Sequence, residues 1–271
     1  MKQGVYILYH KNCTDGFGAA YAAWLKYKNK AYYIPVNYGE PVPEIPNGSK
    51  VFLIDFCYNG NIIREINEKY ELIILDHHVS AESNVKLANK YVFDLKKSGA
   101  SLAWEYFHPH KKNRLIKLIE DKDLWLFNIK DTKPVIAALE SYPRDFRIWH
   151  RLTINRLRRE GMMILKKQDV EVKMACSFHY FKNIGGHKVP VVNTSNYMSD
   201  VAEQLLQIYP DSPFVGVYYD YPKDGQLMRK WSLRSRKKTG VDVSKVAAKF
   251  GGGGHKTSSG FFEKVKGVIY E

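Results

Sequence analysis

Residues 51–56 read VFLIDF, and residues 71–78 read ELIILDHH. Each run is almost wholly apolar until it reaches an aspartate, Asp55 in the first and Asp76 in the second. The segment between them, about Ile62–Tyr70, has the apolar spacing of a helix. Near-continuous apolar strands that alternate with helices are typical of a parallel sheet covered on both faces. The two runs therefore predict an α/β fold in which acidic groups follow neighbouring strands.

The flanking sequence extends this pattern in both directions. Val5–Tyr9 predicts another strand and Phe17–Tyr27 a helix, and Ser101–Phe107 and Arg114–Glu120 predict two more helices. Arg144–Lys173 predicts one long, basic helix, because many of its apolar residues recur at about 100° per residue. Shorter strands return after about residue 181. The elements expected there are a strand at 189–192, a helix at 200–209, strands at 214–219 and 231–234, and a helix at 243–250.

These patterns predict two α/β domains. The first, at residues 1–130, has a parallel sheet, and a smaller one occupies residues 186–271. A helical connector is expected at residues 131–185. A C-terminal section of about 85 residues is long enough for a small domain.

The composition is that of a globular chain with an excess of positive charge. The 271 residues are 45% hydrophobic and 26% charged, and the formal net charge is +14. This charge has two interpretations, a lysine-rich solvated surface or an attraction to a polyanionic partner. Basic runs such as Lys111–Arg114 and Arg151–Arg159 lie apart from the acidic strand ends. This separation favours the polyanionic partner.

Several features argue for a cytoplasmic protein. No apolar run approaches the roughly 20 residues that cross a bilayer. The start, Met1–Gly4, leads into a strand and not into the cleavage region of a secretory signal. Cys13, Cys57 and Cys176 are too few and too scattered for a disulfide framework. We therefore expect a reducing compartment and no membrane partner.

Acidic and imidazole groups follow three predicted strands in succession. His10, Cys13 and Asp15 follow the first strand, Asp55 the second, and Asp76-His77-His78 the third. Ligands of parallel α/β sheets bind outside the carboxyl ends of the strands, so these groups are expected to converge. Histidine, aspartate and cysteine are ligands for divalent transition ions. Taken singly, the aspartates could instead cap helices and the histidines could lie on the surface. The whole set favours a metal site.

The tripeptide at residues 76–78 resembles the signature of the DHH phosphoesterase family. The resemblance continues at residues 9–16 (YHKNCTDG), 53–56 (LIDF), 97–101 (KSGAS) and 119–125 (IEDKDLW). Residues 250–260 (FGGGGHKTSSG) resemble the glycine-rich signature of the associated DHHA1 domain. Together these motifs extend over nearly the whole chain in the family's order. The chain is thus similar to a two-domain DHH/DHHA1 phosphoesterase.

The resemblance implies a hydrolase with two metal ions, usually Mn²⁺, with Zn²⁺, Co²⁺ or Mg²⁺ as alternatives. The side chains that it implies as metal ligands are His10, Asp15, Asp55, Asp76, His77 and Asp123. Asp55 would bridge the two ions. Asp76 and His78 would take part in catalysis, with His78 near the scissile phosphate as ligand support or acid.

Two positions leave alternatives open. Cys13 stands where the family usually has aspartate. It could ligate as a thiolate, which favours a softer ion such as Zn²⁺. It could also be a non-ligand that weakens one metal site, or mark an inactive binding protein. Asp121 competes with Asp123 for the role of the fourth acidic motif.

The C-terminal motif predicts a substrate-binding segment. Glycines allow close backbone approach and present N–H groups to an anion, whereas a flexible linker is the alternative interpretation. Arg234 resembles an arginine that grips phosphate through two oxygens. The residues expected to contact substrate are Ser98, Arg234, Gly252, Gly253, Gly254, His255 and Lys256.

The expected activity is that of a metal-dependent phosphodiesterase or exonuclease acting on short oligonucleotides or dinucleotides. One alternative is a nucleotide 3′-phosphatase of the phosphoadenosine-phosphate type. Another is a non-catalytic nucleotide or nucleic-acid binder. The sequence leaves the oligomeric state open, a homodimer included.

Overall fold

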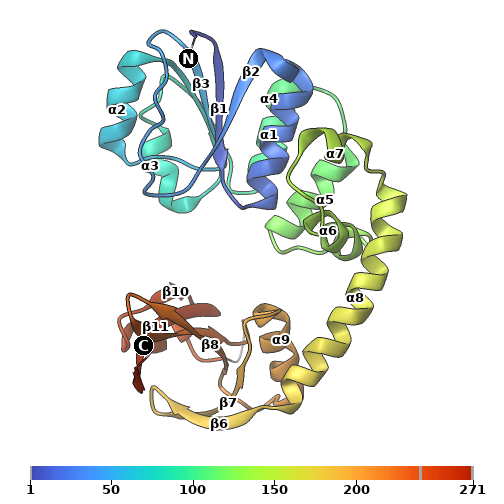
Figure 1. Cartoon of the computed structure of the whole chain (residues 1–271), viewed down its shortest axis with the longest axis vertical. Helices are drawn as coiled ribbons and strands as arrows, with labels where there is room; N and C mark the ends of the chain where they lie inside the picture. The colour runs from blue at the N-terminus through green and yellow to red at the C-terminus, as the bar shows by residue number, and fades with distance from the viewer. Residues whose placement is uncertain (1, 238–239, 270–271) are drawn as a thin grey trace. The chain divides into compact units, whose positions relative to one another are not determined.

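The computed structural model describes residues 2–237 and 240–269. Within them the chain divides into two compact units, with the boundary between Leu165 and Lys166. Both units combine sheet and helix, so the expected α/β class is confirmed (Figure 1). Residues 131–185, which the sequence assigns to a helical connector, are shared between the two units.

The first unit holds a five-stranded sheet and most of the helices. Its strands are β1 Val5–His10, β2 Ala31–Val36, β3 Lys50–Ile54, β4 Glu71–Asp76 and β5 Lys90–Phe93. Its helices are α1 Thr14–Tyr27, α2 Gly60–Lys69, α3 Glu82–Val85, α4 Gly99–Phe107, α5 Arg114–Asp123, α6 Thr132–Glu140 and α7 Phe146–Arg151. Helix α8, Ile154–Ser177, begins in this unit and ends in the second.

The sheet is parallel throughout, in the order β2-β1-β3-β4-β5. Alternate strand residues enter two separate cores, because successive side chains of a strand point to opposite faces. Ile7, Phe52 and Ile73 pack in the core that α1, α4, α5 and α6 share. Leu8 and Leu53 pack in the core on the other face, with α2 and α3. Figure 1 shows these two helical layers on either side of the strands.

The structure adds two strands and divides one predicted helix. Strand β2 lies at the edge of the sheet, where Pro35 costs no ladder hydrogen bond. Strand β5 forms the opposite edge and is short and largely exposed. The expected helix Arg144–Lys173 is wrong as one element, since α7 ends at Arg151 and α8 begins at Ile154. Thr153 caps α8 by accepting a hydrogen bond from Arg156 N at 3.3 Å, which explains the break.

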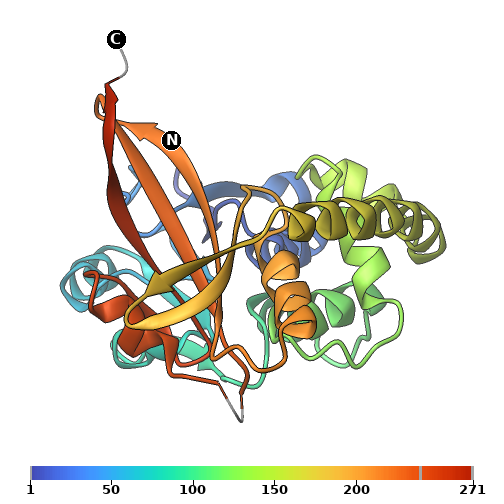
Figure 2. The same ribbon diagram turned by 90° about the horizontal axis from the view of Figure 1, so that it is seen from below.

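The second unit holds a six-stranded sheet in the order β10-β11-β9-β8-β7-β6. Its elements are β6 Tyr180–Ile184, β7 His187–Asn193, α9 Met198–Ile208, β8 Val215–Lys223, β9 Gln226–Arg234, α10 Val243–Ala248, β10 Gly253–His255 and β11 Ser258–Ile269. Among the described strands of this unit, only β7 and β8 pair in parallel. Helix α9 packs with Val215 and Val217, whereas α10 packs with Trp231 and Leu233 on the other face (Figure 2).

No helix among residues 2–237 and 240–269 combines the length and the apolar composition needed to cross a membrane. Cys13, Cys57 and Cys176 are all free.

Close packing of α8 on α6 should make Gly161 intolerant of a side chain. A Cβ on Gly161 would lie 1.6 Å from the carbonyl oxygen of Pro134. We expect Gly161→Ala to lower the free energy of unfolding by about 2 kcal/mol or more, because overpacking forces the helices apart. Urea denaturation measures this loss. The matched control is Gly4→Ala, whose new Cβ would meet nothing closer than 3.7 Å. Equal stability of the two variants would show that α8 does not pack on α6 in this way.

Candidate metal centre

The carboxyl ends of three neighbouring strands bring the predicted side chains together. Strand pairing aligns Tyr9 with Ile54, and Ile54 with Leu75. His10, Asp55 and the start of the 76–78 tripeptide therefore emerge at one edge of the sheet, as the sequence predicts.

Asp55 lies at the centre of this edge. Its side chain is 2% exposed, and its backbone has a φ of 63°, a left-handed conformation that is uncommon outside glycine. Its Oδ2 lies 3.5 Å from His10 Nδ1, and its Oδ1 lies 3.2 Å from His77 Nε2. Neither contact is aligned as a hydrogen bond, so both oxygens and His10 Nδ1 are buried without a hydrogen-bond partner. Such groups are costly unless something compensates them, and a cation would do so.

Asp15 reaches the same place from a helix and not directly from a strand end. It lies in the first turn of α1, which begins at Thr14, three residues before the predicted helix start at Phe17. Its two oxygens accept hydrogen bonds from Gly99 N at 2.6 Å and Ala100 N at 3.0 Å. The first turn of α4 thereby fixes this carboxylate, and its Oδ2 lies 3.8 Å from His77 Nε2.

Two glycines permit the close approach of these elements. A Cβ on Gly16 would lie 2.3 Å from the carbonyl oxygen of His10, so α1 can begin beside the end of β1 only with glycine there. A Cβ on Gly99 would lie 2.6 Å from the Cβ of Asp55. Both glycines belong to the sequence motifs, and their role is to bring α1 and α4 against the strand ends.

The structure distinguishes Asp123 from Asp121. Asp123 Oδ2, at the end of α5, lies 3.7 Å from His77 Nε2. Asp121 is buried and turns away to accept hydrogen bonds from Asn128 N at 2.9 Å, Ile129 N at 3.1 Å and the hydroxyl of Thr132. Asp121 thus holds the loop after α5, and Asp123 is the aspartate of this motif that joins the cluster.

The side chains form three overlapping groups that could each hold a metal ion. The groups are His10, Cys13 and Asp55; Asp55, His77 and His78; and Asp15, His77 and Asp123. One ligand atom from each member lies within 4.8 Å of those of the others. Asp55 and His77 each belong to two groups. Cys13 is thus positioned with its thiol among the candidate ligands. This set of carboxylate, imidazole and thiol donors fits a divalent metal ion.

Electrostatics at the cluster also favour a bound cation. Burial raises the pKa of Asp15 well above its usual range, and the charges of Asp55 and Asp123 raise it further. Burial and the charge of Asp55 likewise raise the pKa of Asp123. Burial opposes ionisation of Asp55 too, but His10 and His77 outweigh it and hold its pKa at about 2. The contact with Asp55, followed by that with Cys13, raises the pKa of His10 to about 10. A divalent ion would relieve the repulsion among these carboxylates.

Asp76 occupies a different position from the other expected ligands. Its Oδ1 accepts hydrogen bonds from His77 N at 2.7 Å and His78 N at 3.1 Å, and contacts His78 Nδ1 at 2.7 Å. It belongs to none of the three ligand groups. Its Oδ2 is nonetheless buried without a hydrogen-bond partner. Asp76 orients His78, whose side chain is one-third exposed.

Ser98 is not placed to meet a substrate. It is fully buried, and its hydroxyl caps α4 by accepting a hydrogen bond from Ser101 N at 3.3 Å. Direct contact of Ser98 with substrate is therefore not what this structure shows. Ser98 instead supports the turn that holds Asp15.

The C-terminal motif forms a strand and not a linker. Gly253–His255 pairs with Ser258–Gly260 across the turn at Lys256 and Thr257. The glycines allow this pairing, since a Cβ on Gly252 would lie 2.2 Å from Gly260 O, and Gly254 has a φ of 138°. The row Arg234, Ser258 and His255 crosses β9, β11 and β10 in register, so these side chains share one face of the sheet. His255 and Lys256 are exposed.

Sequence reasoning did not single out two features of the site. One is the pair of backbone N–H groups at Gly99 and Ala100, which only the folded contact with Asp15 reveals. The other is the exposure of Trp125: this residue ends the motif at residues 119–125, and its side chain is 56% exposed with a backbone φ of 57°. The Asp-x-Trp spacing at residues 123–125 was the only signal for it.

The two aspartates of α5 should differ in their effect on stability. We expect Asp121→Ala to lower the free energy of unfolding by about 2 kcal/mol or more, because it leaves buried donors unpaired. Asp123→Ala should leave stability of the metal-free protein unchanged or higher, because it removes a repelling charge. Urea denaturation in EDTA compares the two. A larger loss for Asp123→Ala would overturn the assignment.

Asp76 should control the titration of His78. The hydrogen bond to Asp76 raises the pKa of His78. Asp76→Asn removes the negative charge that favours the imidazolium, so the pKa of His78 should fall toward its ordinary value. NMR titration of the imidazole signals in EDTA measures the change, with Asp169→Asn on α8 as the control. A His78 pKa that is the same in both variants would contradict the contact.

Comparison with known proteins finds a relative in sequence and similar solved structures. No protein-family model matches the sequence. The uncharacterized protein R106 of Acanthamoeba polyphaga mimivirus is 30% identical over 292 aligned residues, covering 97% of this chain and 68% of the relative. The pGpG-specific phosphodiesterase PggH of Vibrio cholerae aligns with a TM-score of 0.61 and 11% identity, over 97% of this chain and 94% of that one. The manganese-bound exonuclease RecJ aligns with a TM-score of 0.49 and 14% identity, over 95% of this chain and 85% of that one.

The similarity to PggH shows a shared fold. The match to R106, at 30% identity over 97% of this chain, shows common family membership. This chain belongs to the same protein family as mimivirus R106.

Proposed function

We propose that this protein is a metal-dependent phosphodiesterase or exonuclease of the DHH type that hydrolyses short oligonucleotides or dinucleotides. The observation that carries the proposal is the carboxylate of Asp55, buried without a hydrogen bond on either oxygen. It lies between His10 and His77, and two of the candidate ligand groups share it. A shared carboxylate of this kind is what two adjacent dications require, because they repel each other.

The overlapping groups suggest how two ions would be held. His10, Cys13 and Asp55 would hold one ion, and Asp15, His77 and Asp123 the other, with Asp55 bridging. Two ions about 3.5–4 Å apart supply an activated water and neutralise charge that develops on the phosphoryl group. The carboxylate and imidazole donors suit Mn²⁺, whereas a Cys13 thiolate would favour Zn²⁺, with Co²⁺ and Mg²⁺ as further alternatives. The buried, unpartnered Oδ2 of Asp76 could add a further donor.

His78 is the proposed general acid. Its imidazole is fixed by Asp76, which keeps it protonated to higher pH than an ordinary histidine. It is also more exposed than His77, so a bound phosphoester could reach it. From this position it would donate a proton to the leaving oxygen.

The proposed role of the C-terminal unit is to bind a second anionic group of the substrate. The row Arg234, Ser258 and His255 places a guanidinium, a hydroxyl and an imidazole on one face of its sheet. Arginine suits phosphate because its fork of donors matches two oxygens. The net charge of +14 favours an oligonucleotide over a mononucleotide as substrate. The exposed indole of Trp125 offers a stacking surface for a base.

A substrate panel in Mn²⁺ tests this proposal. We expect turnover of two- to five-residue oligonucleotides or of linear dinucleotides, and none of a nucleoside 3′-phosphate. Asp55→Asn should reduce kcat at least 10³-fold, since it removes the bridging charge while keeping the size of the side chain. Asp169→Asn, an exposed change on α8, serves as the matched control. Asp76→Ala should also abolish hydrolysis and leave the fold intact.

The panel separates the alternatives. Turnover of the 3′-phosphate alone would replace the diesterase with a nucleotide 3′-phosphatase. Nucleotide binding without any turnover would make the protein a non-catalytic binder. Full activity in Asp55→Asn would refute the proposed centre.

A further inference from the structure

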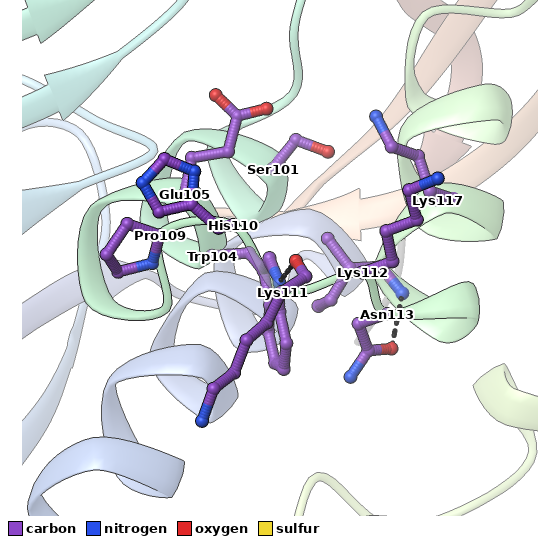
Figure 3. A pocket seen from close by; sticks show the side chains of 10 residues that line it. Ser101, Trp104, Glu105, Pro109, His110, Lys111, Lys112, Asn113 and Lys117 are labelled. Carbon is purple, nitrogen blue, oxygen red and sulfur yellow. Dashed lines mark hydrogen bonds between the residues drawn. The ribbon is translucent and has the colours of Figure 1, made fainter.

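A second candidate binding site lies in the first unit, between α4 and α5. A cavity of about 440 Å³ is lined by ten residues of these helices and of the loop that joins them. Figure 3 shows the side chains around it. Trp104 ties the loop to α4, because its indole N–H donates a hydrogen bond to the carbonyl oxygen of Lys111 at 2.6 Å. The volume lies within the roughly 300–1,000 Å³ of small-molecule sites.

One polar group that lines the cavity has no partner. Ser101 is 2% exposed, and its Oγ makes no hydrogen bond with any described residue. A buried hydroxyl without a hydrogen bond destabilises a protein unless a ligand or water satisfies it. The Ser101 hydroxyl, in the wall of the cavity, therefore has unused hydrogen-bonding capacity that a ligand oxygen would satisfy.

The charge around the cavity is positive. Lys111, Lys112 and Lys117 line it together with His110. Lys117 pairs with Glu120, whereas Lys111 and Lys112 make no ion pair among the described residues. The one acidic side chain of the lining, Glu105, is paired with Lys97.

The start of α5 strengthens the preference for an anion. Asn113, in the lining, caps this ten-residue helix by accepting a hydrogen bond from Ile116 N at 3.2 Å. The N-terminus of a helix carries a partial positive charge, which favours a nearby anion.

From these observations we propose that the cavity binds the phosphate-bearing end of a nucleotide. Lys111 and Lys112 contact the phosphate, the Ser101 hydroxyl donates to it, and the indole of Trp104 lines the part that takes the nucleoside. The proposal goes beyond hydrolysis at the metal centre, because none of these residues belongs to the candidate ligand groups. The same helices nonetheless carry metal-centre residues, Gly99 on α4 and Asp123 on α5. The ligand is either a free mononucleotide or the terminal nucleotide of a bound strand.

Titration calorimetry of the full chain in EDTA tests the site with AMP and, separately, inorganic phosphate. EDTA removes divalent ions, so the result does not depend on hydrolysis, and failure of the proposed activity would leave it unaffected. The double variant Lys111→Ala, Lys112→Ala should weaken AMP binding at least tenfold. The matched control, Lys30→Ala with Lys86→Ala, removes the same charge from exposed sites of the same unit and should bind as the wild type does.

Ser101→Ala separates a ligand contact from a structural role. Deleting an unpartnered buried hydroxyl should leave Tm unchanged or raise it, while AMP binding weakens severalfold. Any of three results would overturn the proposal. They are no binding of AMP by the wild type, the same loss of AMP affinity in both lysine double variants, and wild-type AMP affinity in Ser101→Ala.

An intact three-residue oligonucleotide in EDTA identifies the source of the ligand. Weaker binding of the oligonucleotide by the Lys111→Ala, Lys112→Ala variant would support the end of a strand as ligand. Loss of AMP binding with oligonucleotide affinity unchanged would support a free mononucleotide.

Discussion

The close contact between Asp55 and Gly99 is the constraint on which the site depends. Asp55 adopts a left-handed backbone conformation at the end of β3, and its Cβ occupies the space that a side chain at residue 99 would fill. This contact lets the first turn of α4 reach the strand ends and donate two N–H groups to Asp15. Backbone strain of this kind persists only where the surroundings enforce it, and functional sites are common among such places.

Two helices, α4 and α5, each have one end at the metal-ligand cluster. Helix α4 begins at the cluster, and α5 ends there with Asp123, so both helices have a fixed end. Asp121 fixes the loop beyond α5 through three hydrogen bonds and leaves Trp125 exposed. The cavity around Ser101 lies between these same helices. A ligand in this cavity would contact α4, whose first turn binds Asp15, and α5, which carries Asp123.

The sequence predicted the central strands and the convergence of their polar ends, because a strand buried on both faces has an unmistakable apolar pattern. It did not indicate β2 and β5, whose edge positions leave a mixed pattern. It could not separate Asp121 from Asp123, since both lie at the end of one helix and only folding turns one toward the loop. Ser98 was misassigned because burial depends on contacts between segments far apart in the chain.

The proposed two-metal site depends on Asp55 as the bridging ligand. Crystals of the full chain grown with Mn²⁺, and measured at the manganese absorption edge, test it directly through anomalous scattering. If Asp55 is the bridge, two peaks about 3.5–4 Å apart are expected, each in contact with a carboxylate oxygen of Asp55. A parallel measurement with Zn²⁺ would show whether Cys13 Sγ lies within about 2.3 Å of an ion, as thiolate ligands do. Peaks that avoid Asp55, or no peak at the strand ends at saturating metal, would contradict a bridging role for Asp55.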